Sequence, residues 1–266
     1  AFQTGDMISA ESGIKSPLSE KQYNTRIVPD IQYDVLKPDL YHLIPGLKIL
    51  IEKPTLEEAF ANLALKEEIE GAVEKNREKI ICKKDTEGNP MIDIEKLPAD
   101  IQMKIAPIRQ RYQRVAFKIF LGEHPEAVQR LAMGLGHQLV DEMRIAGRYD
   151  KMREDVKNPP KKDVILNTAT HGLFMESLLQ KAGVLVKEDG TEVEGIKDFE
   201  SPEFGGFIQP SESIYLDIDD PNKLPERIPV IFEGSNRPKA GKVFIDRSKL
   251  EQLDKDYLQW KKLLNK

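Results

Sequence analysis

Residues 163–182 place a strand, a histidine, a glycine and a helix in direct succession. Asp163 to Thr170 is an apolar, β-branched run of the kind that lies inside a sheet covered on both faces. His171 and Gly172 end this predicted strand, and apolar residues then recur at helical spacing from Leu173 to Lys181. Units of this type build α/β proteins, in which ligands bind beyond the carboxyl ends of the strands.

Long helical patterns and short strands alternate along the rest of the chain. Leu47–Ile51 is a short apolar run after Pro45-Gly46, and it is predicted as a buried strand. Helices are predicted over 55–77, 98–120, 125–147 and 248–264, and further short strands over 205–208, 213–218, 228–232 and 242–245. Together these patterns predict one α/β domain over residues 1–266, a three-layer sandwich with a mostly parallel central sheet flanked by helices, with a mainly helical insertion at about 60–150.

Composition and charge exclude several classes of protein. The 266 residues include 40 Lys and Arg against 45 Asp and Glu, a net charge of −5, and 39% are hydrophobic. A general nucleic-acid binder would need an excess of basic residues to displace counterions from phosphates. No apolar run approaches the roughly 20 residues that span a bilayer. We therefore expect a cytoplasmic protein with neither a nucleic-acid nor a membrane partner.

Few side chains are available for metal or imidazole chemistry. Cys82 is the single cysteine, which excludes an internal disulfide and a cysteine-based zinc site. No two histidines share ligand spacing with acidic residues, so neither a metal nor another cofactor is expected. His137 lies off the apolar stripe of its helix and is predicted to face solvent. His171 precedes a helix N-terminus, which can bind an anion such as phosphate; alternatively, it is a strand-end histidine bonded to a neighbouring loop.

The stretch Val164–Val184 resembles the segment of the histidine phosphatase superfamily, the phosphoglycerate mutase-like proteins, that carries their second pocket histidine. Ser16–Lys21 resembles a loop-to-helix segment of the family, and Leu47–Glu58 resembles its strand followed by a glutamate. The helix over 125–146 takes the place of the family's long helix before the second-histidine strand, and Gly206–Ile218 resembles a later strand pair. The similar segments cover about half of the chain.

This resemblance implies hydrolysis of a phosphomonoester, or phosphoryl transfer, through a phosphohistidine intermediate on a small phosphorylated substrate. His171 would hold the phosphoryl group as a catalytic residue, and Gly172 would contribute to substrate binding. Glu58, or Glu57 if the register differs by one, would protonate the leaving alcohol. Such chemistry depends on positioning and charge neutralisation around an in-line displacement.

One central motif of the family is missing from this sequence. No histidine occurs in an Arg-His-Gly or Arg-His-Ala motif, which supplies the family's nucleophile. The chain is then either a catalytically inactive binding or interaction protein on the same fold, or a sequence whose first strand lies upstream of Ala1. We expect the second, because loss of a central strand would leave two rows of backbone groups unpaired. An accidental resemblance on another α/β protein also stays open, as do the substrate and the oligomeric state.

Overall fold

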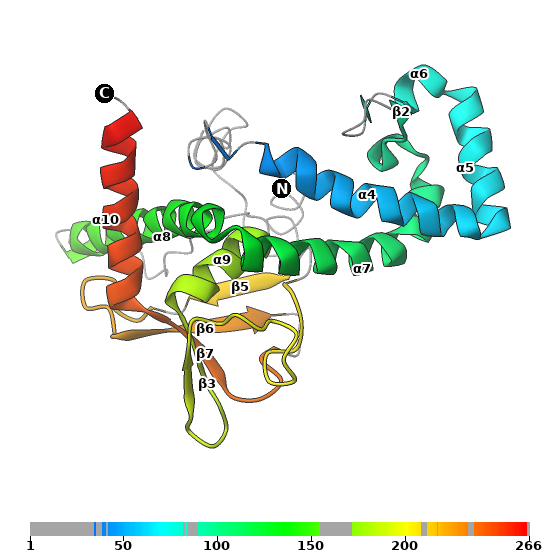
Figure 1. Ribbon diagram of the computed structural model, residues 1–266. Coiled ribbons are helices and arrows are strands. Elements are labelled where there is room, and N and C mark those ends of the chain that lie inside the picture. The colour runs from blue at the N-terminus through cyan, green and yellow to red at the C-terminus, as the bar shows by residue number, and fades with distance from the viewer. Residues whose placement is uncertain are drawn as a thin grey trace. The chain divides into compact units, whose positions relative to one another are not determined.

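The computed structural model describes residues 42–154 and 172–264, together with Val35 and residues 39–40, except for short gaps at 82, 85–89, 209–211, 217 and 234–236. The chain divides into two compact units (Figure 1). One unit is Pro38–His124, and the other contains the described residues from Pro125 onward. The units are described separately below.

The unit at Pro38–His124 is largely helical in its described residues. Its elements are α4 (Leu43–Ala61), α5 (Leu63–Lys75), α6 (Arg77–Ile80), the short strands β1 (Lys83–Lys84) and β2 (Pro90–Met91), the 3₁₀ helix η1 (Ile94–Lys96) and α7 (Ala99–Glu123). α4 packs along α7, and β1 pairs with β2 in the antiparallel direction. The core of this unit is built by Leu56, Ile69, Ile80, Ile94 and Ile105.

The strand predicted at Leu47–Ile51 is wrong, because this segment lies in α4, which continues through Pro54. The hydroxyl of Thr55 donates a hydrogen bond to the carbonyl of Ile51, a bond that Thr often makes inside a helix. Pro45 falls in the first turn, where no backbone N–H is needed. A short apolar run does not distinguish a strand from a helix, and here the packing against α7 decides for the helix.

The helix predicted over 55–77 is interrupted at Asn62, which separates α4 from α5. Asn62 has an extended backbone, and its side-chain oxygen accepts a hydrogen bond from the backbone N–H of Leu65 at 3.3 Å. Asn favours this N-cap position because its side chain satisfies an N–H that the helix leaves open. The helix predicted over 98–120 is confirmed as α7.

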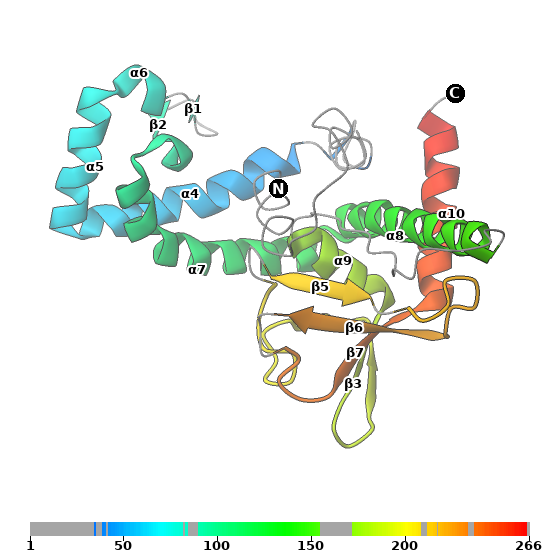
Figure 2. The same ribbon diagram turned by 180° about the vertical axis from the view of Figure 1, so that it is seen from behind.

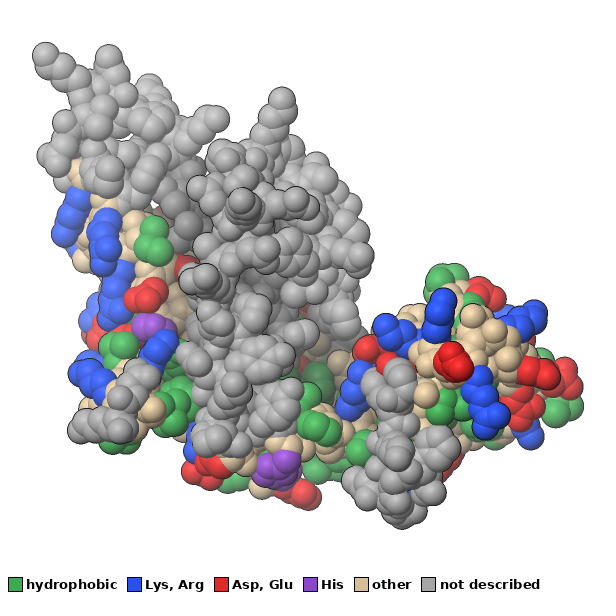
Figure 3. Space-filling view, turned by 90° about the horizontal axis from the view of Figure 1, so that it is seen from above, with side chains coloured by type: hydrophobic (Ala, Val, Ile, Leu, Met, Phe, Trp, Pro, Cys, Tyr) green, Lys and Arg blue, Asp and Glu red, His purple; other side chains and the backbone are tan. Residues whose placement is uncertain are grey.

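The surface over α5 and α6 mixes charges of both signs. Figure 3 shows Lys and Arg side chains interspersed with Asp and Glu side chains in this part of the molecule. The exposed charged residues of the two helices are Glu67, Glu68, Glu70, Glu74, Lys75, Arg77, Glu78 and Lys79. Such mixing is typical of a face in contact with solvent.

The second unit combines helices with one sheet (Figures 1 and 2). Its elements are α8 (Pro125–Glu154), α9 (Gly172–Ala182), β3 (Gly183–Val186), β4 (Glu192–Glu194), β5 (Ser213–Leu216), β6 (Arg227–Glu233), β7 (Lys242–Asp246) and α10 (Arg247–Leu264). The five strands lie in the order β4-β3-β7-β6-β5. α9 contacts β3 and β7, α8 packs against α9, and α10 packs against α8.

The predicted three-layer sandwich with a mostly parallel sheet is wrong. Every strand pairing of the described five-stranded sheet is antiparallel. Along β6, buried Val230 and Phe232 alternate with exposed Ile231 and Glu233, the pattern of an antiparallel sheet with one face against a core. The run at 163–170, from which we predicted a parallel sheet, lies outside the described residues.

The connections explain why the strands run in opposite directions. β3 and β4 are joined by a tight turn in which the backbone N–H of Gly190, at a φ of +82°, donates to the carbonyl of Lys187. A turn this short permits only an antiparallel pair, since a parallel pair needs a long crossover. α9 passes into β3 without an intervening residue. A Cβ on Gly183 would lie 2.3 Å from the carbonyl oxygen of Leu179, so only glycine fits this junction.

Most element predictions in this unit are confirmed. The helices predicted at 173–181 and 248–264 are α9 and α10, and the later strands are β5, β6 and β7. The helix predicted over 125–147 continues past Gly147 to Glu154. The strand predicted at 205–208 is wrong, because Gly205 and Gly206 adopt φ values of +94° and +115° in a loop.

Gly136 sets the close approach between α8 and α10. A Cβ at this position would lie 3.0 Å from the Cβ of Leu253, a closer contact than most Cβ atoms make. We expect Gly136→Val to destabilise the protein by about 1–3 kcal/mol through overpacking, measured by denaturant unfolding.

The control for this prediction is Gly71→Ala in α5. No atom lies within 4 Å of a Cβ added at Gly71, so alanine is expected to stabilise by about 0.5–1 kcal/mol through helix propensity. If Gly136→Val left stability unchanged, the close helix contact would be refuted.

Candidate functional site

The candidate site lies at the N-terminal end of α9. We call it the α9 site and define it by Gly172, Glu176 and the loop at residues 205–208, which packs on this end of the helix. Gly172 is the first residue of α9 and follows His171 in the chain. A Cβ on Gly172 would lie 3.0 Å from the carbonyl oxygen of Ile208, so a larger residue would crowd the backbone of this loop.

Glu176 lies one turn into α9 and has no exposed surface. Helical side chains lean toward the N-terminus, and its Oε1 accepts a hydrogen bond from the backbone N–H of Ile208 at 2.8 Å. The same oxygen lies 3.8 Å from the place that a Cβ on Gly172 would occupy. Oε2 is buried and has no hydrogen-bond partner among the described residues. The carboxyl group is therefore directed at the first turn of α9.

Burial raises the pKa of the Glu176 carboxyl to about 8 from an ordinary value of 4.5. The hydrogen bond from Ile208 and the positive charge of Arg237 lower this pKa, and the negative charge of Glu212 raises it, but burial dominates. Near neutral pH the group is thus a neutral carboxylic acid. It carries no negative charge and has one O–H donor.

The loop at 205–208 is held in place by a buried ion pair. Arg237 donates two hydrogen bonds to the Glu212 carboxylate, at 2.7 and 2.9 Å. The same guanidinium donates to the carbonyl oxygens of Gly205 and Gly206, at 3.1 and 2.5 Å. Both glycines have positive φ, a conformation that L side chains rarely adopt. Arg237 thus fixes the loop that brings Ile208 to Glu176.

This arrangement suits an anion. The first N–H groups of a helix have no partner within the helix, and the helix dipole adds partial positive charge there. α9 has no acidic residue in its first turn. The carboxyl group of the α9 site belongs to Glu176. It is neutral near pH 7, so it does not repel a negative ligand. Phosphate and carboxylate groups are common ligands of such a helix end.

The residues predicted from sequence have different outcomes. His171 lies outside the described residues. Gly172 lies at the α9 site, in close contact with the backbone of Ile208. Its role in substrate binding stays a prediction. Glu58 lies on α4, where its carboxylate accepts hydrogen bonds from Arg111 and, at 3.1 Å, from the hydroxyl of Tyr112. The role of Glu58 as a proton donor stays a prediction.

Glu176 is the residue that the sequence analysis missed. It lies in a buried stretch of α9 that is largely apolar, since Phe174, Met175, Leu178 and Leu179 around it are all buried. An acidic residue within the buried stripe of a helix is rare unless it is paired or functional. That pattern is the signal that could have identified Glu176.

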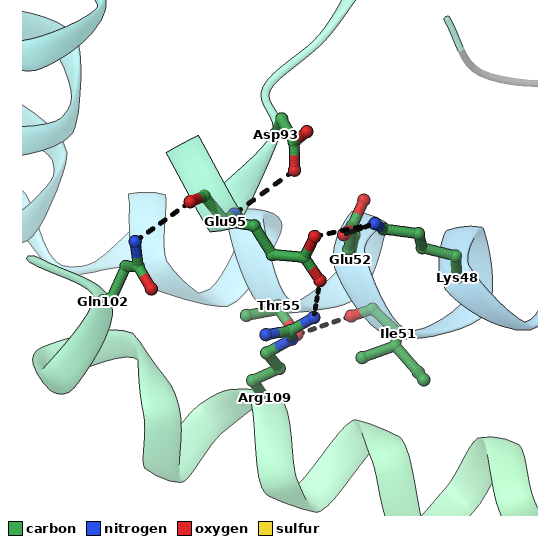
Figure 4. Close-up of polar contacts among 8 residues, drawn as sticks. All are labelled: Lys48, Ile51, Glu52, Thr55, Asp93, Glu95, Gln102 and Arg109. Carbon is green, nitrogen blue, oxygen red and sulfur yellow. Dashed lines mark hydrogen bonds and ion pairs between the residues drawn. The ribbon is translucent and has the colours of Figure 1, made fainter. Parts of the chain in front are cut away.

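A second polar cluster lies within the helical unit (Figure 4). Glu95, in η1, accepts hydrogen bonds from Lys48 of α4 at 3.2 Å and Arg109 of α7 at 3.1 Å. Burial raises the pKa of Glu95, but the hydrogen bonds from Lys48 and Arg109 outweigh it and hold this pKa below its usual value. Lys48 also contacts Glu52 at 3.6 Å. The cluster ties three helical elements together, which is a structural role.

The prediction that His137 faces solvent is wrong. Its side chain is 17% exposed, and its Nδ1 lies 2.7 Å from the carboxylate of Asp254 in α10. The imidazole stacks on the ring of Tyr257 at a centroid distance of 4.3 Å. Arg144 of α8 donates to the same Asp254 carboxylate at 2.6 Å. These contacts join α8 to α10.

Comparison with protein-family models, curated proteins and solved structures finds no significant match for this chain. Among the described residues, no group of three or more His, Cys, Asp or Glu side chains could hold a metal ion. In the same part of the chain, no helix is both long and apolar enough to cross a membrane.

Proposed function

We propose that this protein binds a small phosphorylated molecule at the α9 site and hydrolyses its phosphomonoester or transfers its phosphoryl group. The observation that carries the proposal is the start of α9 at Gly172, directly after His171, beside the buried carboxyl group of Glu176. In this proposal the imidazole of His171 and the first N–H groups of α9 hold the phosphoryl oxygens. The resemblance of Val164–Val184 to the histidine phosphatases supports the same assignment.

The proposal depends on the site and not on the sheet, because function follows from the local chemistry that a fold supports. Gly172 allows the backbone of the loop to approach the helix end, and the neutral Glu176 avoids a negative charge there. The positive end of the helix dipole, next to an acid that carries no negative charge near neutral pH, favours an anion over a cationic ligand.

The first test is hydrolysis of p-nitrophenyl phosphate in the presence of a chelator. We expect turnover by the wild-type protein and a loss of about a hundredfold or more in His171→Ala, the usual effect of removing one group that stabilises the transition state. His42→Ala is the matched control, because His42 is exposed and lies in the other unit. Its turnover should equal that of the wild type.

The second candidate function is binding of the phosphorylated molecule without catalysis. It is favoured by the sequence itself, in which no histidine follows an arginine. Binding of inorganic phosphate, lost in His171→Ala and unaccompanied by turnover, would support this candidate. A wild-type protein that neither binds phosphate nor hydrolyses the aryl phosphate would refute both functions.

A further inference from the structure

We infer that the carboxyl group of Glu176 donates a hydrogen bond to the ligand of the α9 site, so that the site selects oxyanions with unprotonated acceptor oxygens. This inference rests on the proposed function and adds to it a residue that determines specificity. No part of the sequence resemblance assigns a role to Glu176.

The position of Glu176 is the first support. The side chain is fixed at one end, because Oε1 accepts the hydrogen bond from the Ile208 N–H at 2.8 Å. The carboxyl group also lies beside Gly172, where a Cβ would be 3.8 Å from Oε1. It is therefore held next to the helix end at which an anion binds.

The second oxygen supplies the independent support. Oε2 is buried and lacks a hydrogen-bond partner within the part of the chain that the structure describes. Such a buried group is costly unless another atom completes its hydrogen bonding. Holding the loop requires only Oε1. A ligand oxygen at the α9 site would give Oε2 its missing partner.

The protonation state determines the direction of that hydrogen bond. Burial raises the pKa of Glu176 to about 8, so Oε2 carries a proton near neutral pH and donates it to an acceptor. The charged groups that act on this carboxyl in the described residues are Arg237, which favours its ionised form, and Glu212, which opposes it. Ionisation of Glu176 would remove the donor and place a negative charge beside the anion.

The experiment measures the affinity for sulfate by calorimetry at about pH 7.5 and about pH 9.5, a range above the ordinary pKa of histidine and below that of lysine. Sulfate is the probe because it stays doubly charged over this range, and inorganic phosphate serves as the second probe. For the wild type we expect the affinity to fall by about tenfold or more as Glu176 ionises.

The variant Glu176→Gln separates this inference from a structural role. Its amide oxygen can accept from Ile208, and its amide N–H can donate at every pH. We therefore expect its sulfate affinity to change by less than about twofold over the range and to match that of the wild type at the lower pH. The control Glu188→Gln, at an exposed glutamate in the turn after β3, should follow the wild-type profile. Circular dichroism establishes that each variant is folded.

Three results are distinguishable. A steep fall in the wild type that is absent in Glu176→Gln supports the inference. Anion binding with the same pH profile in both proteins overturns the inference and leaves the proposed function standing. If the wild type binds neither anion at either pH, the proposed function fails and the inference fails with it.

Discussion

Replacing Glu212 with alanine is expected to lower the free energy of unfolding by about 3–5 kcal/mol, because it leaves a buried guanidinium without its partner. The side chains of Arg237 and Glu212 are 7% and 3% exposed, so water compensates poorly for the carboxylate that is lost. The two hydrogen bonds between them are also lost. Urea unfolding at neutral pH measures the change.

The matched control is the pair of Arg227 and Glu192 in the same sheet. Its N–O distance is 2.8 Å, close to that of the buried pair, but its side chains are 33% and 49% exposed. Glu192→Ala is expected to cost less than about 1 kcal/mol, since exposed ion pairs contribute little. Equal losses of unfolding free energy in Glu212→Ala and Glu192→Ala would show that burial does not determine how much the ion pair of Arg237 contributes to stability.

Glu176→Gln is expected to stabilise the protein at alkaline pH and to leave its stability nearly unchanged under acid conditions. The pKa of Glu176 is about 8 in the folded state against an ordinary value of 4.5, so between these values the folded state holds a proton that the unfolded state has released. The free energy of unfolding of the wild type therefore falls as pH rises through this window. Below pH 4.5 the contribution of Glu176 to the free energy of unfolding is fully retained, and above about pH 8 this free energy no longer changes with the ionisation of Glu176.

The size of the effect follows from the shift in pKa. At 1.36 kcal/mol per unit, the full shift from 4.5 to about 8 corresponds to about 5 kcal/mol, so Glu176→Gln should exceed the wild type by about that amount near pH 9. Urea unfolding over a series of pH values measures the difference, and Glu188→Gln is the exposed control. A difference between Glu176→Gln and the wild type that is constant at every pH would contradict a raised pKa.

The helices could be predicted from the sequence where one face is clearly apolar. α7 and α10 follow from apolar residues that recur every three or four positions. Leu47–Ile51 could not be assigned correctly, because five apolar or long side chains in a row fit either a strand or a helix. Its packing against α7 is a tertiary contact that a local pattern does not contain.

Whether neighbouring strands of the sheet run parallel or antiparallel could not be predicted from the sequence. The alternation of apolar residues predicted β6 and β7, but it did not show which strands pair. β3 pairs with β7, about sixty residues later in the chain, and only the structure shows that they run in opposite directions. The strands β3 and β4, of four and three residues, were not predicted.

The sequence predicted one part of the candidate site and missed another. Gly172 was found because it follows His171 at the start of a helix. Glu176 is near it in the chain, but its burial, its hydrogen bond to Ile208 and its raised pKa come from segments about thirty residues away and beyond. A buried acid acquires its chemistry from such distant neighbours, which a local motif does not specify.

The direct passage of α9 into β3 has a consequence for the motion of the α9 site. No residue separates the helix from a strand that lies between β4 and β7, so the C-terminal end of α9 is anchored to an interior strand and its tilt is restricted. We therefore expect α9 and β3 to unfold together as one cooperative unit. A helix anchored in this way has less conformational entropy to lose on ligand binding than a helix on a flexible linker.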